Sequence, residues 1–157
     1  RVGVSTAKGL CFGAGIPLVA IGSLDTLVWQ AIGEGLLPEG CKYIVPMIDA
    51  RRMEVYTAVF NADGSQASET EPKVIDSESF ADILSEGPVL FIGDGADKCR
   101  ETILSPNAHF VQAYPKAESM LVPGSRLLSE GKTEDVAYFE PFYLKQFVPT
   151  VSKKKIL

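Results

Sequence analysis

The chain has 157 residues, of which 46% are hydrophobic and 22% charged, enough for an ordinary globular core in one or two small domains. Its formal net charge is −5 and the only concentrated basic run is residues 153–155, so we expect that the chain alone does not bind nucleic acid. Three widely spaced cysteines form no disulfide framework or CxxC motif, which favours a reducing, cytoplasmic setting. The longest uncharged stretch, residues 9–24, is too short for a transmembrane helix, so no membrane association is expected.

The N-terminal part predicts two helices joined by a short strand. Residues 1–14 place small or apolar side chains at helical spacing, but no capping residue precedes them, so we expect Arg1 to be a cut point with a segment missing upstream. A glycine and a proline end this helix, and residues 18–21 form an apolar run typical of a strand covered on both faces. Ser23 then caps a second helix, whose apolar stripe consists of Leu24, Leu27, Val28, Ala31 and Ile32.

After residue 40 the pattern changes to extended segments and then to alternating strands and helices. Residues 43–48 and 55–60 flank a polar turn and predict a hairpin, and a third strand is expected at 72–75. The later elements are expected as a helix to residue 84, a strand at 88–92, a helix at 96–104, a strand at 109–113 and a helical region at 116–129. This α/β order, βββαβαβα, predicts a mixed sheet with helices on its faces, as in the ribonuclease H-like and actin-like folds.

We therefore expect three parts in the chain. Residues 1–40 hold two helices and a strand, residues 41–137 form one lobe, and residues 138–157 form a C-terminal aromatic segment and tail. Five of the chain's aromatic residues fall between positions 138 and 147, where a core clasp is favoured over base stacking.

Two loops are candidates for anion binding. Gly93 and Gly95 lie in a glycine-rich turn between a strand and a helix, where backbone N–H groups can face a phosphate. The turn lacks the third glycine of a dinucleotide fingerprint and the Gly-Lys-Ser/Thr of a P-loop, so a plain tight turn with an Asp cap is favoured over a vestigial nucleotide site. Asp49 lies where a strand enters the hairpin, and a structural pairing with Arg51 is favoured over an anion-contacting role.

The inventory of catalytic groups is small. His109 is the only histidine, which excludes a two-histidine zinc site or relay within this chain. The sequence contains no Gly-x-Ser-x-Gly nucleophile elbow, and no base can be assigned to a cysteine. We therefore assign no catalytic residue, no metal ligand and no cofactor to the chain.

The two N-terminal helices are the better functional candidates. Small residues on the first would let another backbone approach closely, and the stripe of the second offers an apolar packing face. Packing within the chain and packing against a partner are equally compatible with this pattern. Trp29, which lies off the stripe, favours a protein interface.

Several segments follow the patterns of one family in order along the chain. They are Gly3-Val4-Ser5-Thr6-Ala7-Lys8-Gly9-Leu10, Pro17-Leu18-Val19-Ala20, Ser23-Leu24-Asp25, Ile48-Asp49-Ala50-Arg51-Arg52-x-Glu54-Val55-Tyr56, Gly93-Asp94-Gly95 and Glu140-Pro141-x-Tyr143-Leu144-Lys145. The chain thus resembles the TsaB (YeaZ) family, once labelled glycoprotease-like, which takes part in threonylcarbamoyladenosine synthesis on bacterial tRNA. The resemblance implies an actin-like ATPase (ASKHA, ribonuclease H-like) fold, with one lobe and the remnant of a first lobe. Three N-terminal strands and a glycine-rich loop of the family precede the point where this chain starts, and Lys145 replaces a common Arg.

The resemblance also implies a function. The chain would be a non-catalytic scaffold or activator of a TsaD-type catalytic subunit that holds ATP and metal, in an assembly with a TsaE-type ATPase. It would contact tRNA only through the complex and form a homodimer in isolation. The implied partner interface comprises Val4, Ala7, Lys8, Cys11, Leu24, Leu27, Val28 and Ala31. The alternative is an ATP-binding phosphotransferase of the actin-like superfamily, and a glycoprotease-like peptidase is the least favoured.

Overall fold

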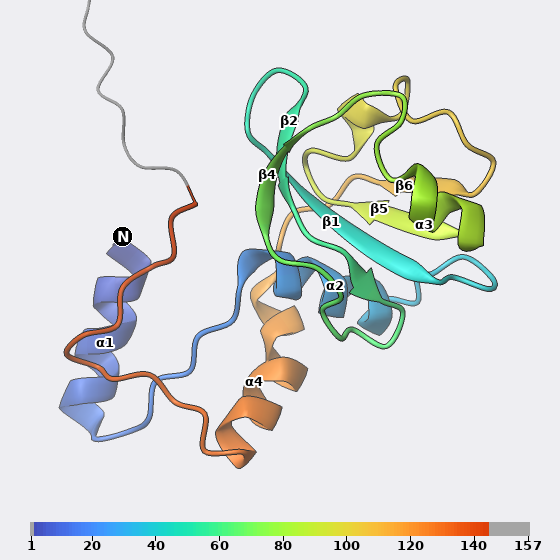
Figure 1. Ribbon diagram of the computed structural model, residues 1–157. Helices are drawn as coiled ribbons and strands as arrows, with labels where there is room; N and C mark the ends of the chain where they lie inside the picture. Colours follow the sequence, from blue (N-terminus) through green and yellow to red (C-terminus); the bar gives the residue numbers. More distant parts are fainter. Residues whose placement is uncertain (1, 145–157) are drawn as a thin grey trace, which may run out of the picture.

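A mixed β-sheet forms the centre of the protein (Figure 1). The structure, a computed structural model, describes residues 2–144, so the predictions for Arg1, Lys145 and the lysines at 153–155 lie outside the described residues. The strands are β1 Tyr43–Asp49, β2 Glu54–Thr57, β3 Phe60–Asn61, β4 Glu71–Val74, β5 Val89–Ile92 and β6 Ala108–Val111. Their order is β4-β2-β1-β5-β6, with β3 also paired to β1. β1, β5 and β6 run parallel and the other pairs are antiparallel, which confirms the predicted mixed sheet.

The predicted strand at 55–60 is interrupted in the structure. Both β2 and β3 pair with β1 in one continuous register, Met47 with Thr57 and Ile44 with Phe60. The break lies opposite Pro46, which has no N–H to donate to a neighbouring strand. The Thr57 hydroxyl instead donates to the Pro46 carbonyl at 2.8 Å. A single proline in the central strand thus divides its partner into two.

The helices are α1 Val2–Ala14, α2 Ser23–Gly33, α3 Ala81–Glu86 and α4 Leu121–Ser129, with short 3₁₀ helices η1 Asp97–Cys99 and η2 Ala117–Met120. Helix α2 covers one face of the sheet, and α3 and η1 cover the other. Successive residues of β5 point to opposite faces, so Leu90 packs with α2 whereas Phe91 packs with α3 and η1. All four residues of β5 are buried, as expected for a parallel strand covered on both faces. No helix within residues 2–144 has both the length and the apolar content needed to cross a membrane.

Two predicted elements are wrong. Residues 18–21 do not form a strand: Leu18 makes only an isolated bridge to Glu134, because no described strand lies beside it. Residues 96–104 do not form an α-helix. They contain only η1 and turns, and four of their N–H groups bond three residues back, as from Cys99 to Ala96 at 3.0 Å.

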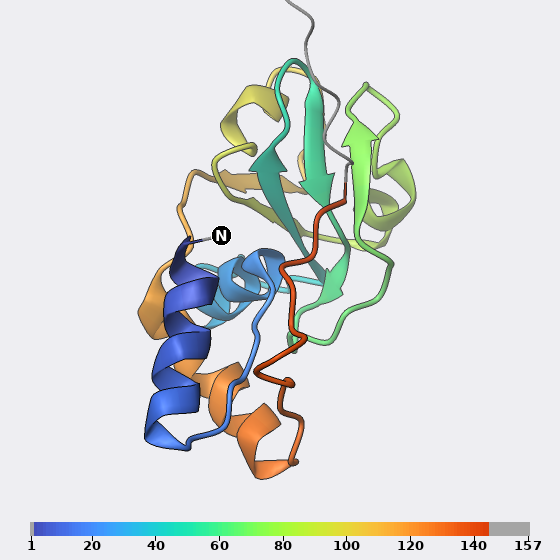
Figure 2. The ribbon, with the colours of Figure 1, turned by 90° about the vertical axis from the view of Figure 1, so that its left-hand side faces the viewer.

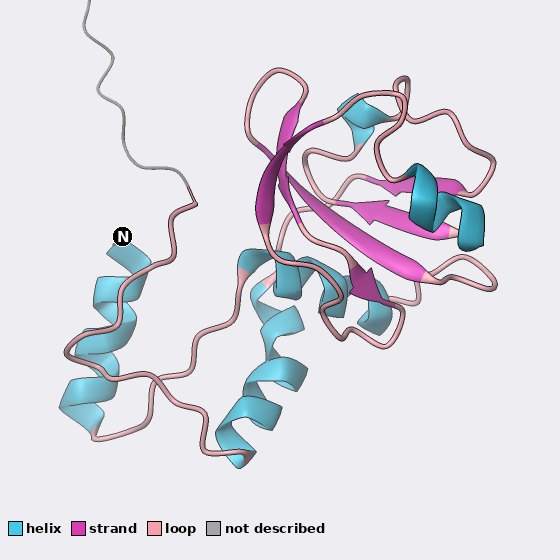
Figure 3. Ribbon diagram, viewed as in Figure 1, coloured by secondary structure: helices cyan, strands magenta, loops and turns pink. Residues whose placement is uncertain are grey.

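Helix α1 lies apart from the sheet. None of its residues is buried, and both α1 and α4 extend away from the strands (Figure 3). It runs beside the C-terminal segment, residues 137–144, in both views (Figure 2). The Lys8 amine donates to the carbonyls of Ala137 at 3.2 Å and Phe139 at 2.8 Å. The Cys11 thiol of the same helix donates to the Pro17 carbonyl. The described side-chain hydrogen bonds from α1 to the rest of the chain are thus made with the C-terminal segment and with the loop at Pro17.

Candidate functional site

The four α2 residues of the implied interface lie in the core. Leu27, Val28 and Ala31 are fully buried and Leu24 is 7% exposed, all packed against β1, β3 and β5. Their stripe follows helical spacing because it faces the sheet. In this structure these residues pack within the chain, and their assignment to a partner interface stays a prediction.

The four α1 residues of the implied interface lie on its inner face. Val4, Ala7, Lys8 and Cys11 are half-buried, at spacings of three and four residues. Lys8 bonds the C-terminal segment, and the Cys11 thiol donates to the Pro17 carbonyl at 3.6 Å. In this structure the inner face of α1 therefore lies against the C-terminal segment and the loop at Pro17.

The exposed apolar residues of α1 were missed by the sequence analysis. Val2 is 82% exposed, Leu10 66% and Phe12 83%. These exposed apolar groups, on a helix that buries nothing, make α1 a candidate surface for association. In the sequence these residues differ from the inner ones only by their position around the helix. That position indicates exposure only once the inner face is known to be covered.

Trp29 makes a contact within the chain in this structure, and its role at a protein interface stays a prediction. Its indole packs over the turn at Gly64, where an added Cβ would lie 3.3 Å from the ring. Gly64 has a φ of +87°, so the turn requires glycine for its backbone as well as for this contact. Trp29 thereby holds the β3–β4 loop against α2.

The structure brings the two predicted anion-binding loops together. β1 and β5 are parallel, so the loops after Asp49 and after Ile92 meet at one edge of the sheet. The Asp49 N–H donates to the Asp94 carboxylate at 3.0 Å, and the Gly95 N–H donates to the Met47 carbonyl at 3.0 Å. Asp94 therefore joins the two loops rather than capping a helix, which corrects its predicted role.

The glycines of this edge permit close contact between main chains. A Cβ on Gly93 would lie 2.1 Å from the Met47 carbonyl oxygen, and one on Gly95 would lie 3.1 Å from the Asp49 nitrogen. The Gly93, Gly95 and Ala96 N–H groups all donate to carbonyls of the chain itself. A phosphate would have to displace these bonds, so the geometry matches the plain tight turn and not an open phosphate cradle.

Lys98, which the sequence analysis did not single out, is the principal partner of Asp49. Its amine forms an ion pair with the Asp49 carboxylate and donates to the carbonyls of Arg52 and Glu54, each at 2.7 Å. Arg51 contributes its backbone N–H, at 3.0 Å from the Asp49 carboxylate. Above all the Lys98 hydrogen bond, and then that N–H, hold the pKa of Asp49 below its ordinary value. The predicted pairing with Arg51 thus exists through the main chain, and Lys98 completes it.

The lowered pKa of Asp49 makes part of the stability pH-dependent. Its contribution is full above the unfolded-state pKa, about 3.9, and is lost as the pH falls through the lower folded-state value. We expect Asp49→Asn to lower the free energy of unfolding at pH 7 by at most about 1 kcal/mol, because the pair is partly exposed to solvent. Urea unfolding at pH 7 and pH 2.5 measures the difference, which should be smaller at the lower pH. The exposed Glu39→Gln is the charge control, and a penalty of the same size at both pH values would contradict this role.

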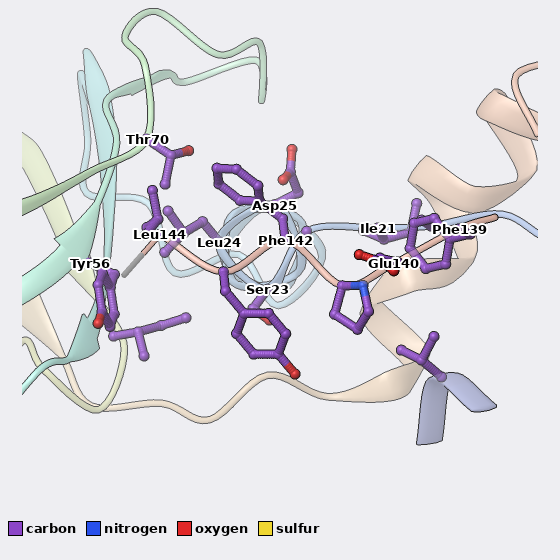
Figure 4. A pocket seen from close by; sticks show the side chains of 16 residues that line it. Ile21, Ser23, Leu24, Asp25, Tyr56, Thr70, Phe139, Glu140, Phe142 and Leu144 are labelled. Atoms are coloured by element: carbon purple, nitrogen blue, oxygen red, sulfur yellow. The ribbon is translucent and has the colours of Figure 1, made fainter. Parts of the chain in front are cut away.

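A groove of about 570 Å³ opens at the N-terminal end of α2 (Figure 4). Its walls come from the first turn of α2, the ends of β1 and β2, residue Val4 of α1 and the C-terminal segment. Four aromatic side chains line it, Tyr56, Phe139, Phe142 and Tyr143. The charged lining residues are Asp25 and Glu140. Burial raises the pKa of Asp25, with its own N–H opposing the shift.

The described residues do not form a metal site. No three His, Cys, Asp or Glu side chains within residues 2–144 come together as a ligand group. His109 lies at an exposed position on β6. The groove and the edge near Asp49 are candidate sites of recognition.

A protein-family model described as "TsaD: tRNA N6-adenosine threonylcarbamoyltransferase" matches residues 1–149. TsaB of Escherichia coli strain K12, a tRNA threonylcarbamoyladenosine biosynthesis protein, is 30% identical over 156 residues, which cover 94% of this chain and 65% of that protein. The chain belongs to the TsaB (YeaZ) family. TsaB of Bacillus subtilis strain 168 is 33% identical over 96 residues, which cover 59% of this chain and 39% of that protein. The chain thus spans less than two thirds of the length of these TsaB relatives.

Solved structures of YeaZ proteins share the fold. YeaZ from Pseudomonas aeruginosa aligns with a TM-score of 0.71 and 23% identity, over 91% of this chain and 67% of that one. A second Pseudomonas aeruginosa structure, of a protein described as similar to the peptidase YEAZ, aligns with a TM-score of 0.73, 23% identity and coverage of 92% and 67%. With the family match, this confirms the predicted actin-like fold class and the older glycoprotease-like label.

Proposed function

We propose that this chain serves in threonylcarbamoyladenosine synthesis on tRNA as a non-catalytic subunit that supports a TsaD-type catalytic partner. The observation that carries the proposal is α1, a helix that buries no residue and presents Val2, Leu10 and Phe12 to solvent. The names of the TsaB relatives supply the pathway. ATP and metal belong to the catalytic partner, a TsaE-type ATPase completes the assembly, and tRNA is contacted only through the complex, in the cytoplasm.

The exposed face of α1 suits a helical partner. Gly3, Gly9 and Gly13 have open space around them, so another backbone can approach closely. Burying each large apolar side chain there would contribute roughly 1.5–3 kcal/mol. The same face accounts for a homodimer when the catalytic partner is missing.

The test is binding of the full-length protein to its TsaD-type partner. We expect the double substitution Leu10→Ser and Phe12→Ser to weaken the complex at least tenfold, because both side chains are exposed anchors on α1. Calorimetric titration measures the affinity, and circular dichroism checks that the melting temperature is unchanged. Leu128→Ser, on α4 and 49% exposed, is the matched control.

Either of two results would refute the proposal. One is undiminished affinity of the double variant, which would remove the exposed face of α1 from the interface. The other is full tRNA modification by the partner proteins when this subunit is omitted.

The geometry weighs against the alternative, an ATP-binding phosphotransferase. Lys98 neutralises Asp49, and the N–H groups of Gly93 and Gly95 are already bonded within the chain. Titration of the full-length protein with Mg-ATP should therefore give no binding heat. A saturable heat that Gly95→Ala abolished would support the phosphotransferase.

A further inference from the structure

The charged side chains that line the groove are both acidic. Asp25 comes from the first turn of α2 and Glu140 from the C-terminal segment (Figure 4). The described lining residues include no Lys, Arg or His. Neither carboxylate takes part in an ion pair found within residues 2–144. The groove therefore has an acidic wall whose two carboxylates form no ion pair within residues 2–144, although Arg126 and Lys132 line a neighbouring pocket that Asp25 shares.

The remaining walls suit the stem of a long cationic side chain. Tyr56, Phe139, Phe142 and Tyr143 contribute aromatic rings, whose faces attract cations. Ile21 and Leu24 supply apolar surface for methylene groups, which lysine and arginine bury while their charged ends stay with polar partners. A volume of about 570 Å³ admits several side chains of a peptide.

We propose that this groove is the docking site for a basic segment of a partner protein, with a lysine or arginine side chain held between Asp25 and Glu140. The same acidic wall repels phosphate, so it disfavours a nucleotide or an RNA backbone there. Partial burial destabilises the charged form of the Asp25 carboxylate, and a bound cation would compensate for its lost solvation. The inference goes beyond the proposed function and does not depend on it, because the groove and its charge would select a basic segment whatever the assembly does.

The probe is a short acetylated peptide in which two arginines flank a leucine, titrated into the ¹⁵N-labelled full chain. We expect saturable amide shifts at residues 22–25 and 70, which line the groove. A peptide with citrulline in place of arginine keeps the shape and removes the charge, and it should bind at least tenfold more weakly.

Two substitutions of the protein complete the test. Asp25→Asn and Glu140→Gln should each weaken binding of the arginine peptide about fivefold, because each removes one of the two carboxylates that would face the cation. Glu140 is exposed on a segment outside the core, so its substitution leaves folding intact even if Asp25→Asn disturbs α2. Glu39→Gln, at an exposed position away from the groove, should leave the affinity unchanged.

Several results would overturn the proposal. Equal affinity for the citrulline peptide would show that charge does not select the ligand. If Glu39→Gln weakened peptide binding as much as the groove variants, the effect would come from net charge and not from the groove. Saturable shifts of the same amides by Mg-ATP would identify a nucleotide as the occupant, and shifts that grew with protein concentration alone would identify a second copy. The catalytic partner is absent from every arm, so failure here would leave the proposed function unaffected.

Discussion

Replacing Gly93 with alanine should destabilise the protein by about 3–5 kcal/mol, the largest effect that we expect from a single methyl group. Gly93 has a φ of +136°, and an added Cβ would lie 2.1 Å from the Met47 carbonyl oxygen. That oxygen belongs to the backbone of the central strand β1, which cannot rotate away as a side chain can. The loop would have to leave the sheet edge and break the Gly95 hydrogen bond to Met47.

Gly40 provides the matched control for Gly93. It has a φ of +70°, but nothing lies within 4 Å of the position that its Cβ would occupy. Gly40→Ala should therefore cost only the backbone strain, about 1 kcal/mol. Urea unfolding of both variants separates strain from collision. Equal penalties at the two positions would contradict the close approach of the Gly93 loop to β1.

Local sequence patterns predicted the sheet well because the apolar pattern of its strands matches their burial. β5 is a short apolar run, and it is buried on both faces as the run indicates. Pro46 shows where the pattern fails: the apolar residues at 55–60 continue past the break, and the break is set by a proline in the neighbouring strand. Residues 18–21 fail for a related reason, since a strand needs a partner that local pattern cannot supply.

The sequence identified most residues of the edge near Asp49, but it did not predict the contacts between them. Asp49, Arg51, Gly93 and Gly95 do meet at one edge, because parallel strands place their following loops together. Lys98 was missed because its role depends on three acceptors distant in sequence. The groove was missed altogether, since Asp25 and Glu140 are 115 positions apart, and their shared lining is a property of the fold.

Leu27→Ala should destabilise the protein by about 2–5 kcal/mol. Leu27 is fully buried, with an exposed fraction of 0%. It packs in one cluster with Ile44, Leu90 and Ile92 of the sheet. Truncation would leave a cavity that the rigid strands β1 and β5 cannot fill. Leu10→Ala removes the same atoms from α1, where the side chain is 66% exposed, and should change the free energy of unfolding by less than about 0.5 kcal/mol.

The two leucine variants also decide which helix faces a partner. Binding to the TsaD-type subunit should be weakened by Leu10→Ala while stability is kept, because Leu10 lies on the exposed face of α1. Leu27→Ala should lower stability first, and affinity should be retained under conditions in which the variant stays folded. The opposite result, a stable Leu27→Ala protein with lost affinity, would mean that the α2 stripe leaves the sheet to meet the partner. Chemical unfolding and calorimetric titration on the same samples distinguish the two outcomes.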